Sequence, residues 1–277
     1  MWLLKRLLDF YIDSSIHVAL TVCSLFWITA LDFDVSINKN LLFFTFFATI
    51  TGYNFVKYFG LAKFHHRPLA NWLKYIQIFS LFAFLGLCYF TTKLDIKTLI
   101  YLIGLGVVTF LYAIPLLPRK YFLDASKNLR AVSGLKIYII AFVWSITTVI
   151  IPLINAETTI NNDIIIALFQ RFFFVVVLTL PFEIRDMQFD NLKLGTIPQR
   201  IGVKQTKVIG IALLILFCLA EFFKDEITQI QIVITIVISV LMAVFLIASE
   251  VKQSKYYSSF WVEGFPIIWL ILILLYA

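Results

Sequence analysis

Three carboxylates near the end of an apolar stretch, Glu183, Asp186 and Asp190, are separated by three and then four residues. On a helix this spacing places all three on one face. Like charges repel one another unless a cation lies among them, and carboxylates suit Mg²⁺, which proteins commonly hold together with substrate phosphates. The spacing therefore favours a Mg²⁺–diphosphate site. A solvated helix end, with Arg185 as its counter-ion, is the alternative interpretation.

These acids belong to a chain with the composition of a membrane protein. Of the 277 residues, 61% are hydrophobic and 14% are charged, and the mean hydropathy is +0.95. Soluble domains are roughly half apolar and about a quarter charged. The composition therefore excludes a soluble enzyme, a nucleic-acid-binding module and a disordered protein. Cys23, Cys88 and Cys218 are isolated in apolar runs, which argues against a disulfide framework or a zinc site.

Nine stretches approach the roughly 20 apolar residues that cross a bilayer. They predict an all-α, polytopic membrane protein in which residues 1–277 form one helical bundle of about nine transmembrane helices. Before the first stretch, Lys5 and Arg6 begin a segment that we interpret as an interfacial helix leading into an uncleaved span. The stretches lie near residues 15–31, 40–60, 73–91, 98–117, 135–154, 164–184, 207–223, 228–249 and 260–277.

The positive charges predict the orientation of these spans. With the N-terminus inside, the inner segments hold 18 of the 23 Lys and Arg residues and the outer loops hold 4. Cytoplasmic loops carry such an excess, so we expect the N-terminus inside and the C-terminus outside. The expected location is a bacterial inner membrane, with the acidic segment on the cytoplasmic side.

The acidic segment and the span pattern resemble the UbiA superfamily of intramembrane prenyltransferases, which have nine transmembrane helices. The second aspartate-rich motif of that family closes helix six with acids spaced by three and then four residues, followed by Gly, Thr and Gly. The resemblance implies that the three acids are catalytic and bind Mg²⁺ beside a prenyl diphosphate. The matching residues are Glu183, Asp186, Asp190, Gly195, Thr196 and Gly202.

The first motif of the family is only partly present. Its pattern is Asn-Asp, two further Asp residues and then Arg-Pro-Leu. Asn54 and the Arg67-Pro68-Leu69 turn match, but the three acids are absent, and Lys57 or Tyr58 stands near one of the missing positions. Half of the ligand set that the family uses for Mg²⁺ is therefore missing.

Basic side chains could neutralise a diphosphate in place of the missing metal ligands, because Arg binds phosphate in a bidentate manner and Lys acts as a point charge. Lys57 would then be a compensating change, although loss of function explains it equally well. For the basic loops, the ordinary excess of inner positive charge is the alternative. The expected diphosphate-binding residues are Asn54, Lys57, Lys63, Arg67, Arg130, Lys136 and Lys193.

The resemblance implies a prenyltransferase that moves a prenyl group from an isoprenoid diphosphate to a lipophilic acceptor of the quinone, haem or lipid type. Its expected partners are these two substrates and the bilayer, without nucleic acid. The alternative is a catalytically altered or inactive relative that binds isoprenoid or lipid phosphates or serves another membrane protein. A transporter is less favoured, because the ionisable residues gather at one face. The acceptor, the chain length and the oligomeric state stay open.

Two further charged residues lie in apolar surroundings. Arg171 is seven residues into the sixth stretch, where an arginine suggests a functional site. It could line a cavity, pair with Glu157 or Asp163, or extend to the membrane surface. Glu263 stands at the start of the ninth stretch and is interpreted as an ordinary acid at a helix N-terminus.

Overall fold

The computed structural model describes residues 2–58, 71–113, 134–188 and 195–276. Every regular element in these ranges is a helix. The elements are α1 (Trp2–Asp13), α2 (Ile16–Asp32), α3 (Lys39–Tyr58), α4 (Asn71–Thr91), α5 (Ile96–Ala113), α6 (Leu135–Ser145), the π-helical η4 (Ile146–Ile150), α7 (Ile151–Asn155), α8 (Asn162–Asp186), α9 (Ile197–Glu221), α10 (Gln229–Ala248), the π-helical η6 (Tyr257–Val262) and α11 (Phe265–Tyr276).

Each predicted apolar stretch coincides with one of these helices or with a run of them. The fifth stretch is the continuous α6–η4–α7 segment, and the ninth is η6 followed by α11. Six helices in the described ranges are long and apolar enough to cross a membrane, and the bent pair α1–α2 would make a seventh. The protein is thus an all-helical, multi-pass membrane protein, while nine spans and an inside N-terminus remain predictions.

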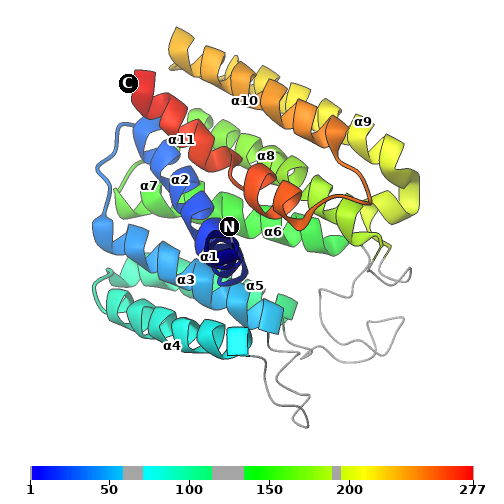
Figure 1. Ribbon diagram of the computed structural model, residues 1–277. Coiled ribbons are helices and arrows are strands. Elements are labelled where there is room, and N and C mark those ends of the chain that lie inside the picture. Colours follow the sequence, from blue (N-terminus) through cyan, green and yellow to red (C-terminus); the bar gives the residue numbers. More distant parts are fainter. Residues whose placement is uncertain (1, 59–70, 114–133, 189–194, 277) are drawn as a thin grey trace, which may run out of the picture.

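Most consecutive helices pack on each other, and contacts of α2 with η4 and with α11 close the arrangement into a ring. α2 packs on α3, α3 on α4, and α5 on the α6–η4–α7 segment. That segment packs on α8, which is followed by α9, α10 and α11, and α11 returns to α2 (Figure 1). Because the long helices alternate in direction, α3 and α8 end where α2, α6 and η6 begin. We call this part of the molecule the site end, and the other the opposite end.

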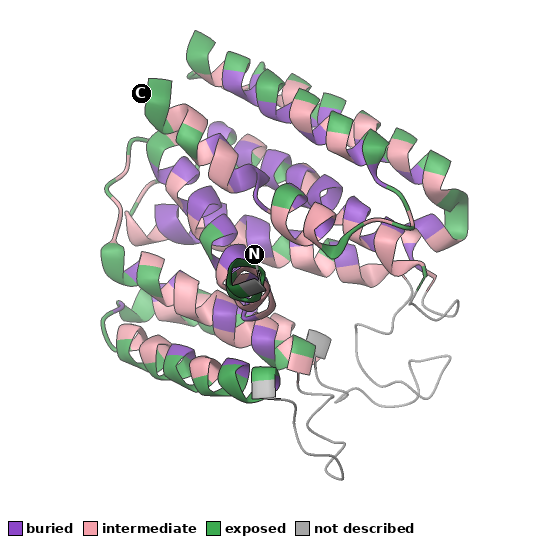
Figure 2. Ribbon diagram, in the orientation of Figure 1, coloured by how far each residue is buried: buried purple, intermediate pink, exposed green. Residues whose placement is uncertain are grey.

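The interior of the ring is apolar and closely packed. Helix α8 contributes more buried residues than any other described helix (Figure 2). Phe174, Phe217 and Trp269 from α8, α9 and α11 form an aromatic cluster with ring centroids 5.2 to 5.7 Å apart. The outer faces of α4, α9 and α10 expose large apolar side chains, including Phe82 at 64% and Val240 at 56%. Such a surface suits lipid as its solvent.

The N-terminal helix is separate from the first long helix, as the sequence predicts. α1 and α2 meet at an angle of 57°. Ser15, at the junction, has a positive φ of 65°, which interrupts the helix. α1 is tied to the segment before η6, where Lys255 forms ion pairs with Asp9 at 2.6 Å and Asp13 at 3.6 Å, and Tyr256 donates a hydrogen bond to Asp9. The first and last parts of the ring are thereby joined at the site end.

At the opposite end, Arg171 is buried within the ring, and the predicted pairing and surface positions are wrong. Only 4% of Arg171 is exposed. It donates hydrogen bonds to the Leu25 carbonyl and the Thr29 hydroxyl, and its guanidinium lies 5.3 Å from the centre of the Trp269 ring. Asp32 at the end of α2 is close enough for its charge to interact with that of Arg171. The sequence missed this partner because the two residues are far apart in the chain.

Neither of the two acids predicted as partners of Arg171 pairs with it in the structure. Asp163 accepts hydrogen bonds from the backbone N–H groups of Asp225 and Glu226, so it fixes the loop between α9 and α10. Glu157 lies in the turn after α7, with a positive φ of 56°. Arg171 itself lines a cavity, as one of the sequence alternatives predicts, together with Gln170, Glu221 and Lys224. There Gln170 donates to Glu221, and Lys224 forms an ion pair with the same carboxylate.

We expect Arg171→Leu to lower the free energy of unfolding by about 3–5 kcal/mol, because it removes the cation that faces Asp32 in a buried site. Thermal unfolding of the detergent-solubilised protein measures the effect. Lys97→Leu, an exposed lysine at the same end, is the matched control and should change stability by less than about 0.5 kcal/mol. Equal melting temperatures for the two variants would contradict this role of Arg171.

Candidate functional site

The last turn of α8 places two of the three predicted acids at the site end. α8 begins at the N-cap Asn161, whose side chain accepts a hydrogen bond from Ile164, and it runs for 25 residues. At 1.5 Å per residue this is about 38 Å, longer than the roughly 30 Å hydrocarbon core. Glu183 and Asp186 therefore lie where the helix reaches the boundary of the membrane.

Both acids already have a basic partner. Glu183 is only 3% exposed and forms an ion pair with Lys136 at 2.8 Å, which joins α8 to the start of α6. Asp186 accepts hydrogen bonds from Arg185 at 2.8 and 2.9 Å. The counter-ion role predicted for Arg185 is thus present, and Lys136, predicted to bind diphosphate, lies beside an acid of the motif.

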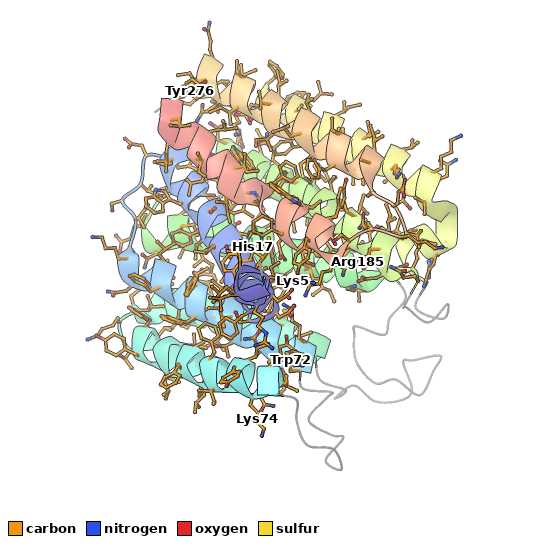
Figure 3. All side chains as sticks on the ribbon, viewed as in Figure 1. Lys5, His17, Trp72, Lys74, Arg185 and Tyr276 are labelled. Carbon is orange, nitrogen blue, oxygen red and sulfur yellow. The ribbon has the colours of Figure 1, made fainter. Side chains whose placement is uncertain are left out.

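Arg185 connects α8 with η6. Its Nη1 donates hydrogen bonds to the hydroxyls of Ser258 at 2.8 Å and Ser259 at 3.1 Å. Its guanidinium also lies 5.3 Å from the centre of the Phe182 ring, within the range of a cation–π interaction. Figure 3 shows Arg185 at the site end of the bundle. These contacts hold the guanidinium in one orientation beside the acids of the motif.

Asn54, predicted to bind diphosphate, is buried in a network of internal hydrogen bonds. Its side-chain carbonyl accepts from Ser15, and its amide donates to the Ser14 carbonyl and to the Ser80 hydroxyl. Only 4% of Asn54 is exposed. Its contacts connect α3 with α4 and with the α1–α2 junction, so the observed role of Asn54 is structural.

Lys57 lies one turn further along α3 and reaches the site. Its Nζ donates to the Ser15 hydroxyl at 2.8 Å and lies 6.0 Å from the centre of the Tyr53 ring. The side chain is exposed, unlike that of Asn54. Lys57 is also near enough to Glu263, between η6 and α11, for the two charges to interact. The acid that sequence analysis assigned to an ordinary helix start therefore belongs to this site.

The structure brings together Lys57, Lys136, Glu183, Arg185 and Asp186 at one end. Asn54 lies in the internal network described above, and the remaining predicted site residues are outside the described ranges. Within the described ranges, no three His, Cys, Asp or Glu side chains lie together as metal ligands. The predicted residues outside the described ranges are Lys63, Arg67, Arg130, Asp190 and Lys193.

The Gly-Thr-Gly part of the motif has a structural explanation. Gly195 and Gly202 both have positive φ angles, 53° and 81°, which other residues rarely adopt. Thr196 precedes α9, and its backbone N–H donates to the side chain of Gln199. Gly202 makes a kink within α9. These residues direct the chain from the acidic segment into the next helix.

The segment before η6 is held by ion pairs. The carboxylates of Asp9 and Asp13 raise the pKa of Lys255, although partial burial opposes the shift. Gln253, two residues earlier, donates a hydrogen bond to the carbonyl of Pro181 in α8. Residues 249–256 thus connect α1 with the end of α8.

Comparison with solved structures agrees with this architecture. The chain is similar to a solved structure described as digeranylgeranylglyceryl phosphate synthase in membranes, with a TM-score of 0.55 and 16% sequence identity over 98% of this chain and 96% of the other. The protein therefore has a UbiA-like membrane fold, as the sequence resemblance predicts. No family model and no curated protein matches the sequence.

We expect Lys136→Met to destabilise the protein by about 3–5 kcal/mol, because Glu183 would remain buried without a counter-ion. Adding Glu183→Gln should restore most of the lost stability, since the double variant has no buried charge at this position. Thermal unfolding of the two single variants and the double variant gives the coupling energy. Additive effects of the two substitutions would show that the ion pair does not stabilise the fold.

Proposed function

We propose that this protein is an integral-membrane prenyltransferase that transfers a prenyl group from an isoprenoid diphosphate to a lipophilic acceptor. The observation that carries the proposal is the cluster of basic and acidic side chains at one end of a UbiA-like ring. The apolar side chains of the bundle suit a prenyl chain, while the charged end suits its diphosphate. The solved structure with a similar fold, described as a synthase in membranes, supports the same class of reaction.

The basic side chains are the diphosphate ligands in this proposal. Lys57, Lys136 and Arg185 come from α3, α6 and α8, and each currently contacts a protein oxygen. A bound diphosphate offers oxygens that can replace those partners, with bidentate contacts to the guanidinium. Stabilising the negative charge of the leaving group is the main catalytic requirement for forming an allylic cation.

The donor set of the motif also suits Mg²⁺. Glu183 and Asp186 are carboxylates on successive turns, and Asp186 is 23% exposed at its side chain. Mg²⁺ usually keeps several waters and binds through one or two carboxylates plus phosphates, so two described acids are enough, with Asp190 as the predicted third. When bound, the ion would supply positive charge to the departing diphosphate.

The second candidate function is a catalytically inactive relative that binds isoprenoid or lipid phosphates. The ion pairs of Glu183 and Asp186 favour it, because each acid already has a cation without a metal. The absence of acids around Lys57 in the first motif favours it as well. Catalysis and simple binding differ in whether the bond between the prenyl group and the diphosphate breaks.

The test of the proposed function is diphosphate release from labelled allylic prenyl diphosphates by the purified full-length protein, with a membrane lipid extract as the source of acceptors. Parallel samples contain Mg²⁺ or EDTA. Mg²⁺-dependent release together with a prenylated lipid product is the expected result. Binding without release from folded protein would instead identify the inactive relative.

Asp186→Asn and Asp190→Asn should each weaken Mg²⁺-dependent binding of farnesyl diphosphate at least about tenfold, which corresponds to about 1.4 kcal/mol. The reason is the loss of a negatively charged metal ligand at constant size. Equilibrium binding with and without Mg²⁺ measures the effect. Asp225→Asn, an exposed acid at the opposite end, should bind like the unaltered protein. If both motif variants bind farnesyl diphosphate with unchanged affinity, the assignment of these acids to the site is wrong.

Lys57→Ala should weaken farnesyl diphosphate binding even at saturating Mg²⁺, because it removes a cation that the metal does not replace. Lys57→Asp should instead make binding more dependent on Mg²⁺. Titrations at several Mg²⁺ concentrations compare both with Lys74→Ala, an exposed lysine near the start of α4. If all three variants bind equally well, Lys57 contributes only to membrane orientation.

A further inference from the structure

Glu263 is held in a fixed position by contacts that reach across the ring. It lies in the break between η6 and α11, where its backbone N–H donates to the Ser258 carbonyl. Its own carbonyl accepts a hydrogen bond of 2.7 Å from Thr21 in α2. A side chain on the next residue, Gly264, would lie 2.8 Å from the Phe260 carbonyl oxygen, so the backbone there packs without free space.

His17 in α2 holds the same break from the other side. Its Nε2 lies 2.9 Å from the Phe260 carbonyl and its Nδ1 lies 2.8 Å from the Tyr11 hydroxyl. Because a carbonyl can only accept, Nε2 carries the proton of this hydrogen bond. The ring of His17 also stacks on that of Phe260. Glu263 therefore projects from a rigid part of the backbone, as a group that must hold a reacting atom requires.

The carboxylate of Glu263 differs from the motif acids in having no fixed partner. Glu183 and Asp186 each form a short ion pair. In the part of the chain that the structure describes, the Glu263 carboxylate takes neither a hydrogen bond nor an ion pair, and its side chain is partly exposed. Lys57 and Arg185 are near enough to interact with its charge. It thus has free acceptor oxygens beside two of the three basic residues of the site, Lys57 and Arg185.

A carboxylate in this place cannot itself bind the diphosphate, because the two negative charges repel each other. It can accept a hydrogen bond from the other substrate. Transfer to a hydroxyl forms a bond between the acceptor oxygen and C1 of the prenyl group and breaks the bond between C1 and the diphosphate oxygen. The hydroxyl proton must leave as the new bond forms, and a base beside C1 is required to take it.

We propose that Glu263 is this base: its carboxylate accepts the proton from the hydroxyl of a lipophilic alcohol or phenol, while the diphosphate departs toward Lys57 and Arg185. The inference rests on the proposed function and defines the chemical class of its acceptor. The negative charge of Glu263 favours a neutral hydroxyl over an anionic acceptor.

The experiment uses full-length protein in lipid nanodiscs with labelled farnesyl diphosphate, Mg²⁺ and one of two acceptor probes, 1-dodecanol or 4-nonylphenol. The variants are Glu263→Gln, Glu263→Asp and the control Glu250→Gln, an exposed acid at the same end. Ether formation and the affinity for farnesyl diphosphate are measured on the same samples. The two probes distinguish an alcohol from a phenol as the acceptor.

We expect Glu263→Gln to reduce ether formation at least about 100-fold, the usual contribution of a general base, while farnesyl diphosphate binding changes less than about twofold. Glu263→Asp should restore part of the rate, and Glu250→Gln should behave like the unaltered protein. A Gln variant that forms ether at the normal rate, or that loses binding in parallel with the rate, overturns the proposal.

Measurements on the unaltered protein distinguish a failure of this proposal from a failure of the proposed function on which it rests. If it binds farnesyl diphosphate but forms ether with neither probe, the base role of Glu263 is overturned and the proposed site for the diphosphate stands. If it does not bind farnesyl diphosphate at all, both proposals fail. Melting temperatures of all variants confirm that a lost activity does not reflect unfolding.

Discussion

A charge inside a helical bundle must have a partner, because removing it from water costs several kcal/mol that only good contacts can offset. In this protein two of the buried charges have partners on other helices, so they also fix which helices are neighbours. Lys136 joins α6 to α8 through Glu183, and Arg171 joins α8 to α2. For the same reason, basic side chains lie beside carboxylates at the site end. A bound diphosphate could replace these carboxylates as the partner of the basic groups, and this is the chemical basis of the proposed site.

The helices were predictable where apolar residues are continuous. Hydropathy located α4, α8 and α10 to within two residues at each end. It missed the first ten residues of α9, because Arg200 and Lys204 reduce their apolar character and Gly202 interrupts the helix. Closure of the ring by α11 and α2 was not predictable, since composition contains no information about which apolar faces meet.

The acids of α8 were found because their spacing of three and four residues is a local signal, recognisable without knowing the fold. Glu263 and Asp32 had no such signal, because their partners lie far away in the sequence. An isolated acid within an otherwise apolar stretch was the one available indication for Glu263. Asn54 shows the reverse case, in which a residue that matches a motif is used by the structure to join helices.

Ring closure has a consequence for how the protein is made. Thr21 and Glu263, which are joined by a hydrogen bond, are 242 residues apart, and Glu263 immediately precedes α11. During synthesis, Lys57 and Arg185 emerge and enter the membrane long before that acid exists. The ring can close only after the last helix has been inserted. The site is therefore completed at the end of biogenesis, after the earlier helices are already in the membrane. An insertion machinery that holds the early helices near one another would therefore favour correct assembly.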